Sequence, residues 1–246
     1  RSGFTSFNEK VIFSNAADNK LYSIPVSGGL AERLVFEHEG PEASVYVWPR
    51  VLPDKRHLLV TAAESINRVG LGTIGLYDLE TGAYETLIET ASNATYVDTG
   101  HIVFMRDSAL WAVPFDTETL ELSGPQVPVV QGIENNSAYG HAAYAISETG
   151  KLFFLDGADV GGGGSLNQAT WVARNNETVS TILEPGLHAH LSLSPLEDQF
   201  AVTIYEDSGS SDIWVADLDR GTVGRRTFDG QSSYPIWSPD GRQLIY

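Results

Sequence analysis

The stretch that decides the fold is residues 234–246, Tyr-Pro-Ile-Trp-Ser-Pro-Asp-Gly-Arg-Gln-Leu-Ile-Tyr. In its centre, Pro239 presets φ for the first corner of a turn, Asp240 bonds its own backbone, and Gly241 accepts positive φ. The apolar run 244–246 that follows is too short for a helix and is rich in strand-forming residues. This segment therefore predicts a tight turn that leads into a buried strand.

The same arrangement recurs along the whole chain. Six short apolar runs end at residues 13, 60, 104, 154, 202 and 246, with spacings of 47, 44, 50, 48 and 44. A second strand is predicted after each of the first five runs, and an aromatic residue holds the same place in all five. These residues are Tyr22, Tyr77, Trp111, Trp171 and Trp214. A repeat of about 45 residues with three or four short strands is typical of a β-propeller blade.

The sequence therefore predicts an all-β fold, a β-propeller of four-stranded antiparallel blades. We expect one propeller domain over residues 1–246, six-bladed in the parent protein and seen here as five blades plus one strand. The start and the end of the chain favour a fragment of a longer polypeptide. The predicted blades cover about 5–45, 46–92, 93–137, 138–186 and 187–231, with a partial blade at 232–246.

Charge and composition exclude several classes of protein. The chain has 15 Lys and Arg against 32 Asp and Glu, a formal charge of −17. Such an excess of carboxylates disfavours nucleic acid and anionic membrane surfaces as partners, and favours cationic ones. There is no cysteine, so thiolate metal sites, disulfides and cysteine nucleophiles are excluded. No stretch approaches the roughly 18 apolar residues of a membrane span.

Two glycine-rich stretches resemble nucleotide-binding loops only superficially. Residues 70–75 match G-x-G-x-x-G, but the next segment is a predicted strand in register with four others, whereas a dinucleotide site needs a helix there. The run 161–164 lacks the Lys-Ser/Thr of a phosphate-binding loop. Both are predicted to be loops between strands. No Gly-x-Ser-x-Gly nucleophile elbow occurs either, so the chain is predicted to carry no catalytic residues.

Residues 234–246 resemble the WD40-like (PD40) repeat of the TolB family, and 48–58 are similar, with Lys55 in place of glycine. The stretch 100–129 resembles one branch more closely, the propeller region behind the catalytic domain of bacterial serine/threonine protein kinases. This resemblance covers essentially the whole chain. It implies a non-catalytic sensor or protein-interaction propeller in an extracytoplasmic, periplasmic region of a bacterial kinase or a TolB-like envelope protein. The alternative is a propeller that gates a prolyl-oligopeptidase-like serine peptidase domain outside this chain.

The predicted binding site lies where the innermost strand of each blade begins, near one mouth of the channel. Trp48, His190 and Tyr234 fall at equivalent places in their repeats, and Arg50 lies close to Trp48. His141 opens its blade at a similar position. Aromatic side chains at a mouth suit a protein, peptide or glycan ligand, whereas the alternative is packing between blades. The histidines lack the carboxylate partners of a zinc site, so no metal and no cofactor is predicted.

Overall fold

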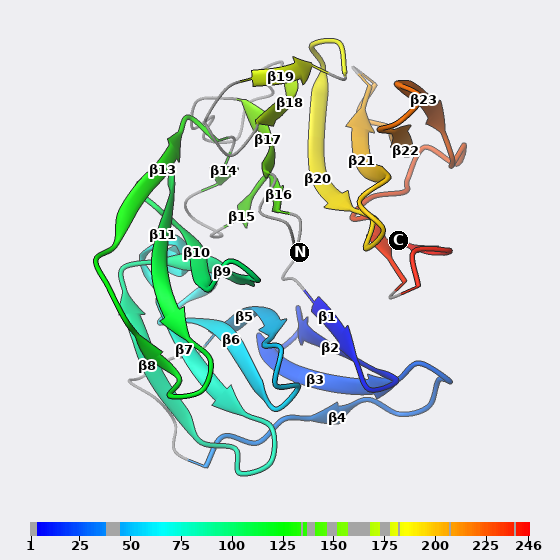
Figure 1. Ribbon diagram of the computed structural model, residues 1–246. Helices are drawn as coiled ribbons and strands as arrows, with labels where there is room; N and C mark the ends of the chain where they lie inside the picture. Colours follow the sequence, from blue (N-terminus) through cyan, green and yellow to red (C-terminus); the bar gives the residue numbers. More distant parts are fainter. Residues whose placement is uncertain are drawn as a thin grey trace. The chain divides into compact units, whose positions relative to one another are not determined.

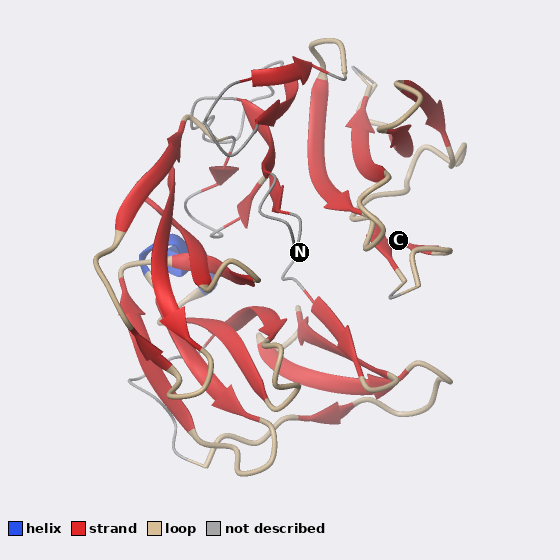
Figure 2. Cartoon of the chain, in the orientation of Figure 1, coloured by secondary structure: helices blue, strands red, loops and turns tan. Residues whose placement is uncertain are grey.

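The computed structural model consists almost entirely of strands and turns (Figure 2). It describes residues 4–37, 45–133, 135–136, 141–146, 152–156, 168–172, 178–181, 183–206, 208–238 and 240–246. In these residues the one helical segment is the short 3₁₀ element η1 (Ile66–Leu71). The chain divides into two units, residues 1–131 with 136–141, and residues 132–135 with 142–246.

The first unit holds three antiparallel sheets whose strands follow chain order from one edge to the other (Figure 1). The first sheet comprises β1 (Phe4–Phe7), β2 (Lys10–Asn15), β3 (Lys20–Pro25) and β4 (Glu32–Arg33). The second comprises β5 (Val45–Val51), β6 (His57–Ala63), β7 (Thr73–Asp78) and β8 (Tyr84–Glu89). The third comprises β9 (Ser92–Val97), β10 (His101–Arg106), β11 (Ala109–Asp116), β12 (Glu121–Leu122) and β13 (Val127–Gln131).

The second unit repeats this order. One sheet comprises β16 (Tyr144–Ile146), β17 (Leu152–Asp156), β18 (Gln168–Val172) and β19 (Thr178–Thr181). The next comprises β20 (Leu187–Leu193), β21 (Gln199–Tyr205), β22 (Ser211–Asp217) and β23 (Thr222–Arg225). A pair of strands, β24 (Ile236–Trp237) and β25 (Leu244–Ile245), follows. Between the units along the sequence lie the short strands β14 (Asn135–Asn136) and β15 (His141–Ala142).

The apolar runs form the second strand of each sheet because both faces of that strand are buried. In β6, Leu58 and Val60 pack with Ile12 and Leu21 of the preceding sheet. Leu59, on the opposite face, packs in the cluster that contains Phe104 of the following sheet. In β21 the same alternation occurs, since Phe200 and Val202 join one core cluster and Ala201 joins another. Burial on both faces needs continuous apolar residues rather than alternating ones, and this confirms the predicted all-β propeller-type blades.

The structure differs from the sequence-based expectation in two places. The partial blade has two paired strands instead of one, because Ile236 pairs with Ile245 although the flanking prolines hide this strand in the sequence. In the third sheet, β12 and β13 both pair with β11, so two segments share the outermost place.

The two-residue turn between β1 and β2 contains no glycine, and Asn8 and Glu9 both have positive φ there (45° and 59°).

The G-x-G-x-x-G stretch was predicted to be a loop, but it runs from the end of η1 into β7, and only Gly72 lies between the two elements. The helix η1 precedes Gly72, and β7 begins at Thr73. Gly75 lies within β7, where an added Cβ would be 2.4 Å from Cζ of Tyr84 and 2.5 Å from the carbonyl oxygen of Glu85. Its role is therefore close packing against the neighbouring strand. The other glycine run, 161–164, lies outside the described residues.

Candidate functional site

Two of the predicted site residues, Trp48 and His190, lie at bulges in the first strands of their sheets. In β5 the pairing register shifts between Val47 and Arg50, and in β20 it shifts between Ala189 and Ser192. Within these shifts Trp48 has φ 55° and His190 has φ 53°. Tyr234, just before β24, has φ 59°, and Asn93 in the bulge of β9 has φ 51°. A bulge turns side chains away from the simple alternation of a strand and is common beside binding sites.

Hydrogen bonds to side chains of an adjacent sheet hold two of these positive-φ residues. The backbone N–H of Asn93 donates to the hydroxyl oxygen of Thr61 at 3.0 Å. The N–H of Tyr234 donates in the same way to Thr203 at 3.2 Å. Both threonines lie in second strands and are 1% and 0% exposed. A left-handed conformation costs a residue with a side chain roughly 1–2 kcal/mol, and these bonds help to offset that cost.

His190 and Tyr234 form a close, tilted ring pair in the second unit. Their ring centroids are 3.6 Å apart and the ring planes differ by 31°. Tyr205, the last residue of β21, meets His190 edge-on at 6.4 Å and 64°. All three side chains are half-buried, so each keeps part of its surface open to solvent. The three aromatic residues His190, Tyr205 and Tyr234, which we call the aromatic triad, come from two consecutive sheets.

The other predicted site residues have different surroundings. Trp48 is 8% exposed and packs in a buried cluster with Val45, Val47 and Val69. Arg50 is half-buried, and its guanidinium donates to the carbonyl oxygen of Pro49 at 3.3 Å. The side chain of His141 lies outside the described part of the chain. Burial of Trp48 agrees with the packing alternative for that residue more than with a ligand contact.

No family model and no curated protein sequence matches the chain. Putative TolB from Agrobacterium tumefaciens aligns with a TM-score of 0.67 at 16% identity, over 98% of this chain and 86% of that chain. TolB from Acinetobacter baumannii aligns with a TM-score of 0.65 at 16% identity, over 98% of this chain and 58% of that chain. The fold is that of a TolB-like β-propeller. With 58% of the Acinetobacter protein covered, this chain spans less than two thirds of its length.

The TolB-like fold is shared with enzymes as well. A puromycin-hydrolyzing peptidase from Mycobacterium tuberculosis aligns with a TM-score of 0.63 at 12% identity, over 96% of this chain and 46% of that chain. An oligogalacturonate lyase in complex with manganese aligns with a TM-score of 0.60 at 12% identity, over 99% of this chain and 73% of that chain. At such identities the likeness establishes the fold and leaves function to the site.

Two features are absent from the residues that the structure describes. Nowhere in them do three His, Asp or Glu side chains come together in a way that could hold a metal ion. No helix among them has the length and apolar character needed to cross a bilayer.

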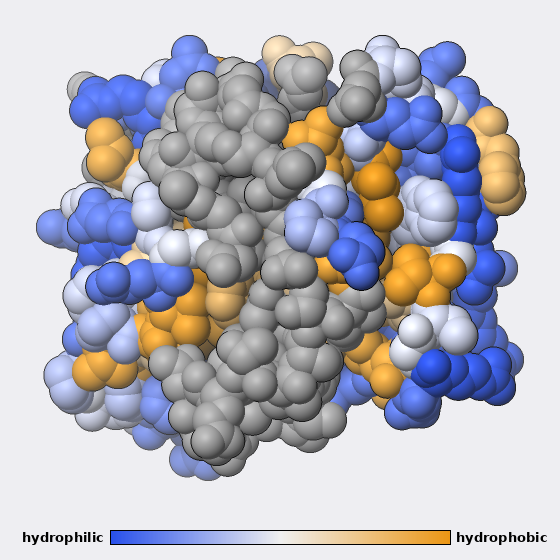
Figure 3. Space-filling view, turned by 90° about the horizontal axis from the view of Figure 1, so that it is seen from above, coloured by the Kyte–Doolittle hydropathy of each residue, from blue (hydrophilic) through white to orange (hydrophobic). Residues whose placement is uncertain are grey.

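The face of the TolB-like propeller in Figure 3 carries many hydrophilic side chains, with hydrophobic patches between them.

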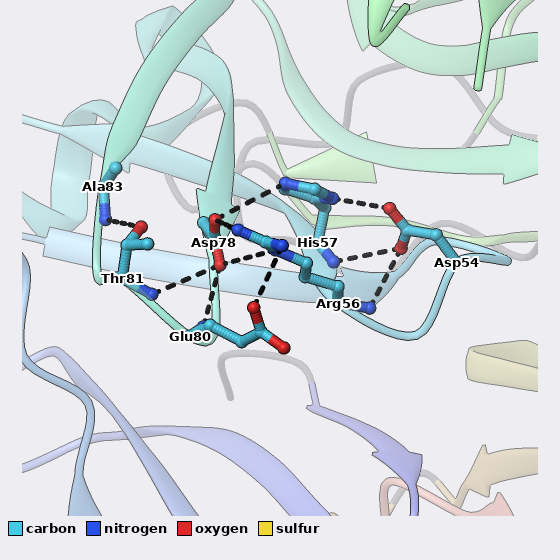
Figure 4. Close-up of polar contacts among 7 residues, drawn as sticks. All are labelled: Asp54, Arg56, His57, Asp78, Glu80, Thr81 and Ala83. Atoms are coloured by element: carbon cyan, nitrogen blue, oxygen red, sulfur yellow. Dashed lines mark hydrogen bonds and ion pairs between the residues drawn. The ribbon is translucent and has the colours of Figure 1, made fainter. Parts of the chain in front are cut away.

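A polar cluster on the second sheet connects two turns (Figure 4). Arg56 donates to both carboxylate oxygens of Asp78, with the shortest contact at 2.6 Å, and lies 2.9 Å from Glu80. His57 Nδ1 is 2.5 Å from Asp54, and its Nε2 is 3.8 Å from Asp78. Asp78 also accepts the N–H groups of Glu80 and Thr81. Since the cluster uses its polar atoms to join the β5–β6 and β7–β8 turns, its role is structural.

The cluster makes stability depend on pH. Hydrogen bonds from Arg56 hold the pKa of Asp78 well below its ordinary value, despite an opposing effect of burial. Burial acts to raise the pKa of Asp54, but bonds with His57 and two backbone N–H groups lower it overall. A lowered folded-state pKa gives stability that is complete above the unfolded value, about 4, and is lost as pH falls through the folded value. We therefore expect Asp78→Asn to be less stable than wild type at pH 7. The difference in the free energy of unfolding between the two proteins should shrink progressively below pH about 4.

Urea unfolding of both proteins at a series of pH values measures this difference. The asparagine retains an oxygen for the backbone N–H groups, so these bonds can persist, while the charge and one acceptor for Arg56 are lost. Glu80→Gln is the control, because Glu80 contacts the same arginine but its side chain is 68% exposed. A wild-type advantage that stays constant down to pH about 2 would contradict the assignment.

Four residues that shape these positions were not predicted from the sequence, namely Asn93, Thr61, Thr203 and Tyr205. Asn93 occupies the same place in its repeat as Trp48. The two residues share a positive φ, which their residue types do not reveal. Thr61 and Thr203 each directly follow an apolar run, so a polar residue at that repeated position was the available signal. Tyr205 carried no recognisable signal, because its contact with His190 depends on the register of β20 against β21.

Proposed function

We propose that this TolB-like propeller is a non-catalytic binding module that recognises a protein, peptide or glycan through the aromatic triad. The close ring pair of His190 and Tyr234 is the observation that carries this proposal. Their backbones adopt positive φ inside or next to strands, and strained positions of this kind cluster at functional sites. The Tyr234 backbone is held through buried Thr203, so the ring is presented from a rigid support.

The chemistry of the aromatic triad suits this class of ligand. Aromatic rings offer apolar faces for a side chain or a sugar ring, and tyrosine adds a hydroxyl that bonds polar groups. The formal charge of −17 favours a ligand with cationic groups. Arg50 and His141 stay predicted ligand contacts, whereas the burial of Trp48 favours a packing role for that residue.

We place the chain in the extracytoplasmic region of a bacterial protein. This rests on the resemblance of residues 100–129 to propellers behind bacterial serine/threonine kinases, and of 234–246 to the TolB repeat. A sensor propeller of a kinase and a TolB-like envelope protein both fit this location. Detection of an upstream kinase domain in the parent gene would favour the sensor.

The second candidate is a propeller that restricts access to a serine peptidase domain. The fold likeness to the puromycin-hydrolyzing peptidase supports it, since this chain aligns with 46% of that protein. A Gly-x-Ser-x-Gly segment encoded downstream of residue 246 would favour this candidate.

Truncation of the aromatic triad is expected to weaken binding without unfolding the protein. Wild type and the variants Tyr234→Ala and His190→Ala are applied to an array of synthetic peptides and oligosaccharides. For ligands that wild type retains, we expect each variant to raise Kd about ten-fold or more, because tyrosine side chains are common hot spots.

The control is Tyr22→Ala, which removes a half-buried tyrosine from β3 in the first unit. It should leave both the ligand set and the affinities unchanged. Equal affinities of Tyr234→Ala and wild type, with unchanged thermal unfolding, would refute the aromatic triad as the binding site. Ligands cleaved or modified on the array would instead refute a non-catalytic role.

A further inference from the structure

The strand β25 has an open edge. It pairs with β24 on one side, and among the residues that the structure describes no strand pairs with its other side. Ile245 of this strand is 54% exposed, and the following Tyr246 is 64% exposed. Natural sheets protect such an edge with a lysine, a proline or a bulge, and residues 243–246 contain no lysine and no proline. The edge is therefore apolar and open to a further strand.

β25 holds the place of a second strand. Residues 239–244 and 53–58 share the order Pro-Asp, three residues and Leu, so Leu244 corresponds to Leu58 of β6. Both leucines pack in the same way against the preceding sheet. Leu58 joins residues of β2 and β3, and Leu244 joins residues of β21 and β22. The open edge of β25 is therefore the edge at which the other second strands pair with the next strand.

In each of the five larger sheets this edge is occupied. The strands that pair there, which we call the third strands, are β3, β7, β11, β18 and β22. In all five pairs an aromatic residue of the third strand lies opposite an apolar residue of the second strand. These pairs are Tyr22–Phe13, Tyr77–Leu58, Trp111–Phe104, Trp171–Phe153 and Trp214–Val202. The residue before the aromatic is Leu or Ile in four of the five third strands.

The register of β6 with β7 shows how such a strand meets β25. Tyr77 lies opposite Leu58, and Leu76 lies opposite the next residue of β6. By the same register, an aromatic residue lies opposite Leu244 and an aliphatic residue lies opposite Ile245. Residues opposite one another share a face of the sheet, so the aliphatic side chain covers part of the exposed surface of Ile245. The edge thus selects a strand with an aliphatic–aromatic pair.

A second copy of this chain is poorly suited to supply that strand. Each third strand lies between paired neighbours in its own sheet, so a copy would have to break a sheet to offer one. The β25 of a second copy offers only the short segment 244–246, and the formal charge of −17 opposes close approach of two copies. An extended segment of a different protein, uncharged or cationic, meets neither obstacle.

We propose that the open edge of β25 binds an extended segment of a different protein, which adds to the β24–β25 pair as a third strand. The main chain of the segment forms hydrogen bonds with β25, and its aliphatic and aromatic side chains lie opposite Ile245 and Leu244. Strand addition to an exposed sheet edge takes its affinity from the main chain and its specificity from alternate side chains. This surface shares no residue with the aromatic triad, so it adds a second binding surface to the proposed function.

The test uses the full chain and a labelled, end-capped peptide with the sequence of β3, Lys-Leu-Tyr-Ser-Ile-Pro. We expect saturable binding by fluorescence anisotropy, and about ten-fold weaker binding when serine replaces the tyrosine of the peptide. Two further peptides carry N-methyl groups on alternate backbone nitrogens, in opposite phase. Because the N–H groups of a strand point alternately to its two sides, one methylated peptide should lose binding and the other should bind like the parent.

Variants of the protein locate the peptide. Ile245→Lys places a charge on the edge, and we expect it to weaken peptide binding about ten-fold or more. Val129→Lys is the matched control, because Val129 is 41% exposed in β13, a strand of the first unit that pairs only with β11. It should leave peptide binding unchanged. His190→Ala should also leave peptide binding unchanged, although it removes part of the aromatic triad.

Several results would overturn the proposal. They are no binding of the parent peptide, equal effects of the two methylated peptides, and unchanged affinity of Ile245→Lys with wild-type thermal unfolding. Loss of peptide binding in His190→Ala would assign the peptide to the aromatic triad instead. Self-association of wild type in sedimentation that Ile245→Lys abolishes would identify a second copy as the occupant. Ile245→Lys leaves the aromatic triad intact, so this test and the test of the proposed function fail independently.

Discussion

Phe200→Ala is expected to lower the free energy of unfolding by about 3–5 kcal/mol, the usual cost of removing a fully buried aromatic side chain. Phe200 is 0% exposed in the central part of the second unit. Its ring lies 5.7 Å from that of Phe153 and packs in a cluster with Leu155 and Val202. The alanine leaves a cavity between the sheet of β16–β19 and the sheet of β20–β23, and these rigid sheets cannot close it by a small shift.

Phe228→Ala is the matched control, because it removes the same ring from a position that is 77% exposed. Urea unfolding followed by tryptophan fluorescence compares the two variants with wild type. If Phe200→Ala is too unstable to purify, Phe200→Leu gives a graded version with a smaller expected loss. Equal stability losses for the two alanine variants would contradict the assignment of Phe200 to the core.

Gly75→Ala is expected to lower the free energy of unfolding by about 3 kcal/mol, the upper end of the usual cost of overpacking. A Cβ at this position would lie 2.4 Å from the Tyr84 ring and 2.5 Å from the carbonyl oxygen of Glu85. The second of these atoms is backbone, so the methyl group must push β8 away from β7. Tyr84 in turn packs near Phe36 and Tyr46, and these contacts limit how far its ring can move.

Gly224→Ala tests whether any glycine in a strand behaves in this way. At Gly224 in β23 the nearest atom to an added Cβ is Nη1 of Arg226, at 3.5 Å, an ordinary contact. We expect this control to change stability by well under 1 kcal/mol. The double variant Gly75→Ala with Tyr84→Ala should show a favourable coupling, because the smaller side chain relieves part of the clash. Independent effects of the two changes would argue against close packing at Gly75.

Much of the fold follows from local sequence alone. The short apolar runs form strands because the second strand of each sheet is buried on both faces, as Leu58, Leu59 and Val60 show. The turn residues work through their own backbone preferences, as when Asp240 accepts the N–H of Arg242 and the hydroxyl of Ser238. The turn bonds join residues two positions apart, so the sequence pattern reports them directly, and the continuous apolar runs report that both faces of the strand are buried.

The site could not be predicted without the tertiary structure, because its contacts join residues far apart in the chain. His190 and Tyr234 were recognised as equivalent positions, but their ring contact depends on the packing of consecutive sheets. The hydrogen bond from Tyr234 to Thr203 likewise spans 31 positions, and that from Asn93 to Thr61 spans 32. Burial separated Trp48 from the more exposed members of the predicted set. Repetition in the sequence determined which strands form, whereas strand register, bulges and packing between sheets determined which side chains meet.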